Sequence, residues 1–166
     1  YGKPIVSLAP RSRIVIGERS VLCSDSEFTA LGVNHPVMLR TLRPDAEIVI
    51  GADTGISGGS ICAASSVRIG HSCLLGANVT IADTDFHAID PINRRYNNRS
   101  TDIEVAPVVI GSNVFIGTNA TILKGVQIGD NSVIGAGSVV VKDIPADCIA
   151  AGNPAKVIRL ISSQIQ

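Results

Sequence analysis

The sequence predicts an all-β solenoid of short parallel strands, and two observations support this. From residue 110 to residue 140 an aliphatic side chain recurs every six positions, at Ile110, Ile116, Ile122, Ile128, Ile134 and Val140. The composition is 45% hydrophobic but only 3% aromatic, with 16 glycines and no Trp. Because large rings usually supply part of a globular core, many small aliphatic residues must here fill a narrow interior.

A period of six fits neither a helix of 3.6 residues per turn nor an alternating strand. It fits a coil of three short strands, each of which presents one aliphatic residue inward and then turns. Gly or Asn at the corner would tolerate a positive φ. Stacked coils bury a continuous aliphatic column, and the six hexads from residue 110 supply two full coils.

The same period appears upstream in three shorter stretches. Its aliphatic or Cys positions are Ile16 and Leu22, then Ile50, Ile56 and Cys62, and, after a slip of one residue, Ile69, Leu75 and Ile81. A chain of 166 residues is long enough for one sizeable core. We therefore expect a single solenoid domain over residues 1–166.

Residues 83–107 interrupt the repeat, and we refer to this segment as the excursion. It is rich in charged residues and also contains His87 and Tyr96; the charged residues are Asp83, Asp85, Asp90, Asp102, Glu104, Arg94, Arg95 and Arg99. Long loops without secondary structure are uncommon in compact domains and are often functional. The alternative is a solvated insertion that the solenoid tolerates.

Bulk properties exclude several classes of protein. A formal net charge of zero gives no support for nucleic-acid binding. No apolar run approaches the roughly 20 residues of a membrane span. The four cysteines form no CxxC pair, which favours reduced, mostly buried thiols in a cytoplasmic protein. No phosphate-binding GxxxxGK[ST] motif or strand–GxGxxG–helix unit is present, which disfavours ATP and dinucleotide binding.

The hexads, the excursion and the tail GAGSVVVKDIPADCIAAGNPAKVIR, residues 135–159, resemble the hexapeptide-repeat acyltransferases. The likeness is greatest to the galactoside and maltose O-acetyltransferases and to the O-acetyltransferases of surface-polysaccharide synthesis, and it covers residues 48–159. The resemblance implies a left-handed parallel β-helix, an acetyl-CoA donor, and a homotrimer with an active site at each subunit interface. Residues 153–166 are expected to form a short terminal helix or extended arm that caps the solenoid and covers its strand edges.

The resemblance implies that His87 is the catalytic base. Acyl transfer from a thioester to a hydroxyl needs a base, and imidazole, with an unperturbed pKa of about 6.5, suits neutral pH. The stretch GANVTIADTDFH matches the family's arrangement of a hexad followed by a catalytic histidine. The side chain that orients the other ring nitrogen is left open among four candidates: Asp85, Asp90, Asp102 and Glu104.

The same match implies acceptor contacts from Asn78 and from Asp83 or Asp85. One departure concerns the histidine itself, where Phe86-His87-Ala88 stands in place of the family's Gly-His-Pro. The excursion is also longer and richer in arginine, which indicates an acceptor other than a simple disaccharide. Neither His35 nor His71 is assigned a role in catalysis.

For the donor, coenzyme A requires a groove with cations for its phosphates. The resemblance places seven residues along that groove: Gly117, Thr118, Gly135, Ala136, Lys142, Lys156 and Arg159. The two glycines would keep it open, while Lys156 and Arg159 would meet the nucleotide phosphates. Val141 replaces a threonine common in the family, at a cost of about 0.5–1.5 kcal/mol for one hydrogen bond.

We therefore expect a cytoplasmic acetyl-CoA-dependent O-acetyltransferase that acts on a sugar or glycan-precursor hydroxyl without a metal. Three alternatives remain open. The first is an N-acetyltransferase with an amino-sugar, amino-acid or antibiotic acceptor. The second is a zinc enzyme of the carbonic-anhydrase type, which would want a third histidine five residues after the second; counted from His71, that position is Gly76. The third is a non-catalytic solenoid.

Overall fold

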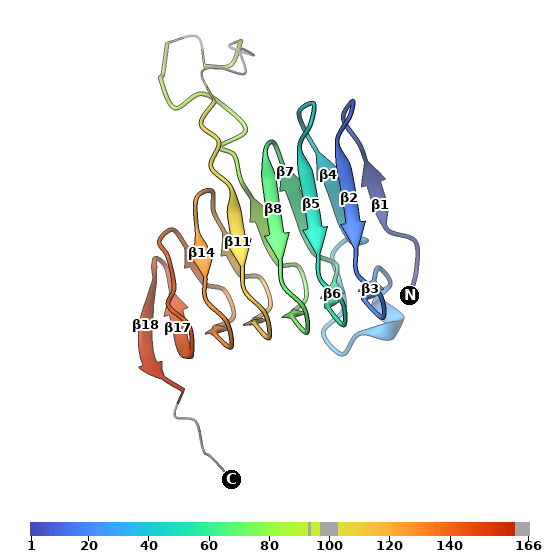
Figure 1. Cartoon of the computed structure of the whole chain (residues 1–166), viewed down its shortest axis with the longest axis vertical. Helices are drawn as coiled ribbons and strands as arrows, with labels where there is room; N and C mark the ends of the chain where they lie inside the picture. Colours follow the sequence, from blue (N-terminus) through green and yellow to red (C-terminus); the bar gives the residue numbers. More distant parts are fainter. Residues whose placement is uncertain (93, 97–102, 162–166) are drawn as a thin grey trace.

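The computed structural model describes residues 1–92, 94–96 and 103–161. Short strands wind into a three-sided coil in which each turn adds one strand to each of three sheets (Figure 1). Sheet A contains β1 Ile5–Ser7, β4 Met38–Thr41, β7 Ser60–Ala63, β10 Thr80–Ala82, β13 Thr121–Ile122 and β16 Val139–Val140. Sheet B contains β2 Arg13–Ile16, β5 Glu47–Ile50, β8 Ser66–Ile69, β11 Val108–Ile110 and β14 Gln127–Ile128.

Sheet C completes the coil and ends in the hairpin of the last two strands. It contains β3 Val21–Cys23, β6 Gly55–Ser57, β9 Leu74–Leu75, β12 Phe115–Ile116, β15 Val133–Ile134, β17 Cys148–Gly152 and β18 Ala155–Leu160. All neighbouring strands are parallel except β17 and β18. A short 3-10 helix, Ser26–Phe28, lies between β3 and β4.

The hexad positions form the core, as predicted for residues 110–140. Ile110, Ile128 and the other four aliphatic side chains of this run are each at most 2% exposed. They stack in register along the sheets: Ile81 pairs with Ile122 and Ile122 with Val140 in sheet A. Stacking of like aliphatic residues in successive coils therefore produces the continuous column that the period indicated.

One hexad position was wrong. The inward residue of β7 is Ile61, which is fully buried, whereas Cys62 is half-buried on the outer face. The registers Leu39↔Ile61 and Ile61↔Ile81 confirm this column. Gly58 adopts a positive φ of 54° in the turn before β7, and this turn is one residue shorter than a regular hexad would give. The column then runs from Ile61 to Ile69 in eight residues, so the connection after β7 is two residues longer than a hexad and the net slip of one residue arises from these two corners together.

Glycine and asparagine have different structural roles at the corners. The left-handed positions are occupied by asparagines such as Asn113, Asn119 and Asn131, with φ of 57–60°. The glycine that directly follows the hexad aliphatic is needed for close approach instead. A Cβ on Gly129 would lie 2.3 Å from the backbone nitrogen of Ala146 in the next coil, so any side chain would force the coils apart.

The C-terminal segment is a strand rather than the helix that was one of the two expectations. β18 pairs antiparallel with β17, with Ala151 opposite Lys156. It thereby satisfies the backbone groups of the last strand of sheet C, which would otherwise present an open edge. The part of the expected cap at residues 162–166 lies outside the described residues. In the described ranges, no helix is long and apolar enough to cross a membrane.

The core column makes a direct prediction about stability. Replacing the fully buried Ile122 by Ala should lower the free energy of unfolding by about 2–5 kcal/mol, because it leaves a cavity in a column that cannot collapse without shifting neighbouring coils. Urea denaturation monitored by circular dichroism measures the change. Leu123→Ala, one residue along and 38% exposed, is the matched control and should cost much less. Equal losses in the two variants would contradict the assigned register.

Candidate active site

The excursion leaves the solenoid at the corner where sheet A turns toward sheet B, which we call corner AB. It follows β10, returns at β11, and projects beyond the coils (Figure 1). Its two limbs are joined at the base, where Thr84 and Val105 form an antiparallel bridge. The Asp85 backbone N–H donates to the Glu104 carbonyl at 3.3 Å, and the Ala106 N–H donates to the Asp83 carbonyl at 2.9 Å. The excursion thus begins as a closed, hydrogen-bonded stalk.

Lys124 ties this stalk to the next coil. It follows β13 at corner AB, and its ammonium nitrogen lies 3.0 Å from Asp85 Oδ2 and 3.2 Å from Glu104 Oε2. The Lys124 and Asp85 side chains are only 23% and 25% exposed. The hydrogen bond to Asp85, followed by that to Glu104, raises the pKa of Lys124, although burial opposes this. Lys124 therefore stays charged at neutral pH and holds one residue from each limb.

Asp83, one of the residues expected to contact the acceptor, lies inside the solenoid. The side chain is fully buried. Its carboxylate accepts hydrogen bonds from the backbone N–H groups of Ala64, Ser65 and Ser66 at 2.6–2.8 Å. Burial raises the pKa of Asp83, and the three backbone hydrogen bonds oppose that rise. Asp83 therefore fixes the corner of the preceding coil, and no part of its carboxylate is open to a ligand.

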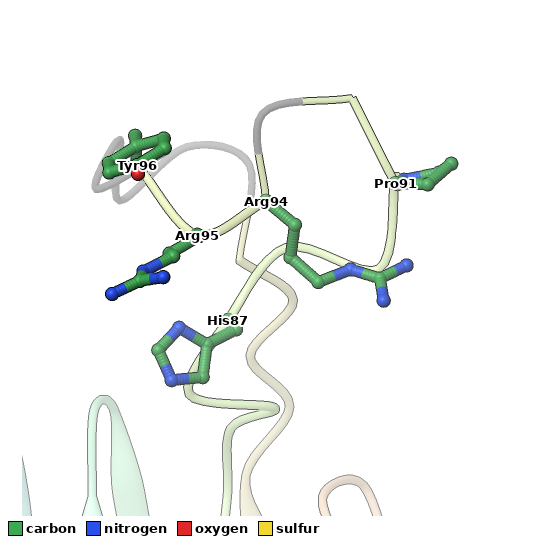
Figure 2. A pocket seen from close by; sticks show the side chains of 5 residues that line it. All are labelled: His87, Pro91, Arg94, Arg95 and Tyr96. Atoms are coloured by element: carbon green, nitrogen blue, oxygen red, sulfur yellow. The ribbon is translucent and has the colours of Figure 1, made fainter.

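His87 lies beyond the stalk and lines a pocket of about 580 Å³ together with Pro91, Arg94, Arg95 and Tyr96 (Figure 2). Phe86, the residue before it, has a positive φ of 63°, which turns the chain sharply at this point. The imidazole is exposed at the pocket. The structure thus brings the predicted base together with two arginines and an aromatic ring that all come from one segment.

No described carboxylate of the excursion forms a hydrogen bond or an ion pair with the His87 ring. Asp85 and Glu104 are paired with Lys124, and Asp90 accepts a hydrogen bond from the Ile92 N–H at 2.8 Å. The fourth candidate for orienting the imidazole, Asp102, lies outside the described residues, as does Arg99. Asp85, which was also a candidate acceptor contact, is therefore placed in the stalk and does not line the pocket of His87.

Asn78 lies at a different corner, where sheet C turns toward sheet A, which we call corner CA. Its Oδ1 accepts the backbone N–H of Asn34 at 2.8 Å. The other two histidines bind locally: His35 Nδ1 is 2.8 Å from the Pro36 carbonyl, and His71 Nδ1 is 3.1 Å from Ser72 Oγ. Strand β10 separates Asn78 from the excursion, so Asn78 and His87 stand at opposite ends of the same strand.

The residues predicted for the donor fall into three places. Thr118 and Ala136 lie at corner CA, where Ala136 is exposed and Thr118 Oγ1 donates to the Ala77 carbonyl at 2.7 Å. Lys142 is exposed at corner AB, after β16. Lys156 and Arg159 are exposed on β18.

The two glycines predicted for the groove serve the packing between coils. A Cβ on Gly117 would lie 2.5 Å from the Ala136 nitrogen, and one on Gly135 would lie 2.8 Å from Ala151 Cβ. By contrast, a Cβ on Gly137 would meet nothing within 4 Å. The open surface at this corner is therefore at Ala136 and Gly137.

Lys124, which fixes the stalk of the candidate site, was not predicted from the sequence. The available signal was a lysine in the turn directly after the hexad aliphatic Ile122, close in space to an acidic excursion only once β10 and β13 are paired. Within residues 1–92, 94–96 and 103–161, no group of three or more His, Cys, Asp or Glu side chains converges as a set of metal ligands.

Comparisons with known proteins agree with this architecture. The family model described as "Hexapeptide repeat of succinyl-transferase" matches residues 107–142. The galactoside O-acetyltransferase of Escherichia coli (strain K12) is 43% identical over 99 residues, which cover 60% of this chain and 46% of that protein. The chain thus spans about half the length of the curated relatives it matches.

Two solved structures match over most of the chain. A maltose O-acetyltransferase from Clostridium difficile 630 is 31% identical, with a TM-score of 0.55, over 98% of this chain and 70% of that one. A hexapeptide-repeat-containing acetyltransferase from Vibrio cholerae O1 biovar eltor, complexed with acetyl coenzyme A, is 27% identical with a TM-score of 0.67. This match covers 89% of the present chain and 71% of the Vibrio cholerae chain.

The stacked three-strand coils and these neighbours define the fold as a left-handed parallel β-helix, which confirms the predicted fold class. The chain belongs to the hexapeptide-repeat acyltransferase family.

The ion-paired stalk predicts that Lys124 protects the excursion. Lys124→Met keeps the length of the side chain but leaves Asp85 and Glu104 without their cation, so the stalk should open more often. Loss of about 1 kcal/mol corresponds to roughly fivefold faster opening. The measurement is the rate of limited trypsin cleavage after Arg94 and Arg95, followed by mass spectrometry at low ionic strength.

Lys3→Met, which removes an exposed lysine of the first coil, is the matched control and should leave this rate unchanged. Cleavage of Lys124→Met at the wild-type rate would show that the two ion pairs do not hold the stalk.

Proposed function

We propose that the protein is an acetyl-CoA-dependent O-acetyltransferase that transfers an acetyl group to a sugar or glycan-precursor hydroxyl, with His87 as the general base. The observation that carries this is the position of His87, which lines a pocket on the excursion of a hexapeptide-repeat solenoid. The relative named a galactoside O-acetyltransferase and the maltose O-acetyltransferase support a hydroxyl of a sugar as the acceptor.

The chemistry assigned to His87 is a proton relay. The imidazole accepts the proton of the acceptor hydroxyl as its oxygen attacks the thioester carbonyl. When the tetrahedral intermediate collapses and the carbon–sulfur bond breaks, the imidazolium returns that proton to the leaving thiolate. The acceptor gains the acetyl group, the donor leaves as the free thiol, and no covalent enzyme intermediate or metal is needed.

The donor residues fit a phosphate-bearing ligand with an extended arm. Lys142, Lys156 and Arg159 are exposed cations that form no ion pair with a carboxylate of the described residues. They are therefore available to phosphate, which arginine and lysine recognise well. The surface at Ala136 and Gly137 offers room for an arm to pass close to backbone. When bound, acetyl-CoA would supply the activated acetyl group.

We further propose a homotrimer with the active site shared between neighbouring subunits. Within one chain, the excursion leaves corner AB while Thr118 and Ala136 lie at corner CA, so a second copy is needed to bring the base and this part of the donor site together. Sheet C also carries an exposed apolar stripe of Val21, Leu74 and Phe115, which lines a hollow of about 250 Å³. Such a stripe suits burial against another copy.

A cytoplasmic location is part of the same proposal. All four cysteines are free and three of them are buried. Free thiols persist in a reducing compartment.

His87→Ala should lower kcat by about 10²–10⁴-fold, the usual cost of removing a general base, while the circular dichroism spectrum and thermal midpoint stay unchanged. The exposed position of the imidazole explains why the fold should not depend on it. A thiol-release assay with acetyl-CoA and sugar acceptors measures the rate. His71→Ala, at a corner away from the excursion, is the control and should keep wild-type turnover. A His87→Ala enzyme with near-wild-type kcat would remove His87 from the mechanism.

Calorimetric titration with acetyl-CoA tests the donor site separately from the chemistry. Wild-type protein should bind saturably, and Lys142→Ala and Arg159→Ala should each weaken binding by roughly 10-fold or more, as expected for losing a charge-assisted hydrogen bond to phosphate. His87→Ala should bind as the wild type does. The absence of binding at millimolar acetyl-CoA would overturn the proposed activity.

A further inference from the structure

The charges of the excursion are separated along its length. Its described carboxylates are engaged: Asp83 binds backbone N–H groups in the core, Asp85 and Glu104 share Lys124, and Asp90 accepts the Ile92 N–H. The described arginines lie farther out, beside His87. Lys124 thus offsets part of the negative charge in the stalk, while the two described arginines bring positive charge to the pocket.

The two arginines keep their charge available to a ligand. Arg94 Nη2 donates to the Ile89 carbonyl, which is a neutral acceptor. The Arg95 guanidinium lies 5.7 Å from the centre of the Tyr96 ring, a cation–π contact that leaves its N–H groups free to bind elsewhere. Both side chains are exposed, and neither forms an ion pair with a carboxylate of the described part of the chain.

The two arginines lie in the same pocket as His87, the proposed base. Figure 2 shows the Arg95 guanidinium near the His87 imidazole and the Arg94 side chain extending toward Pro91, and all three side chains line the same pocket. Tyr96 adds a ring against which a sugar could pack. A volume of about 580 Å³ is within the usual range for a small-molecule site.

We propose that this pocket selects an acceptor that carries an anionic group, a carboxylate or a phosphate, near the hydroxyl that is acetylated. The inference rests on the proposed function and specifies its substrate class. Guanidinium groups bind carboxylate and phosphate through paired hydrogen bonds with a defined direction. An anion held by these arginines would bring a neighbouring hydroxyl of the acceptor into the pocket that the imidazole lines and limit its orientation there.

Binding of the donor is the other role that Arg94 and Arg95 can have, since coenzyme A also carries phosphates. If Arg94 and Arg95 bound the donor, their removal would weaken the binding of acetyl-CoA whichever acceptor is used. If they bind the acceptor, their removal lowers kcat/KM mainly for charged acceptors. The two cases therefore differ in which Michaelis constant changes.

The test compares matched acceptors at saturating acetyl-CoA. Glucuronic acid is paired with its uncharged methyl ester, and glucose 1-phosphate is paired with methyl glucoside, so the two pairs separate a carboxylate from a phosphate. The enzymes are wild type, the double variant Arg94→Gln/Arg95→Gln, and Arg11→Gln as control. Arg11 is an exposed arginine in the first coil, is paired with Asp45 and does not line the pocket of His87.

For wild type, kcat/KM should favour the charged member of at least one pair by about 10-fold or more, the factor that about 1.4 kcal/mol supplies. The double variant should lose that preference, because its kcat/KM should fall by a larger factor for the charged acceptors than for their neutral partners, and its KM for acetyl-CoA should not rise. Arg11→Gln should keep the wild-type preference. The pair that shows the preference identifies the anionic group.

Equal kcat/KM within both pairs would overturn the proposal, as would a double variant whose loss lies in the KM for acetyl-CoA. If no acceptor is acetylated, saturation-transfer NMR with the same four ligands decides the question. Selective binding of a charged member, abolished in the double variant, would support the anion site. Absence of selective binding would refute it. The calorimetric titration with acetyl-CoA reports separately whether the proposed function itself fails.

Discussion

The structure depends on the close stacking of one coil on the next. Neighbouring strands of a sheet lie about 4.8 Å apart, so each coil must present the same inward aliphatic and the same narrow corner as the coil before it. Gly129 shows how strict this is, because a Cβ there would overlap the backbone of Ala146 at 2.3 Å. An insertion cannot be accommodated within a strand without losing register. It can leave only at a corner, which is where the excursion begins.

The excursion has a stalk that is fixed to the solenoid and an outer part that carries His87. Its base is fixed by the Thr84–Val105 bridge and by Lys124, which belongs to the following coil. Ion pairs and backbone hydrogen bonds of the stalk thus connect the segment that carries His87 to the solenoid. Catalytic groups need such positioning, because small displacements cost large factors in rate. The arginines of the pocket lie beyond the stalk, beside His87.

Part of the candidate site could be predicted because it is local in sequence. The break in the hexads exposes His87, and the arginines of the excursion are visible beside it. Other features could not be predicted, since they depend on pairing between coils. The carboxylate of Asp83 meets backbone N–H groups of residues 64–66 only after β7 and β10 pair. Lys124 likewise meets Asp85 and Glu104 only because β13 lies next to β10.

The sequence by itself determined the solenoid, because a strict six-residue period leaves one physical solution for burying its aliphatic side chains. It also located the excursion and its histidine. Tertiary structure decided the inward position of Ile61 in place of Cys62, since a shortened corner shifts the pattern in a way that hydrophobicity alone does not reveal. It also decided that the C-terminal segment pairs as β18, because the open edge of β17 becomes available to it only once the coils have stacked.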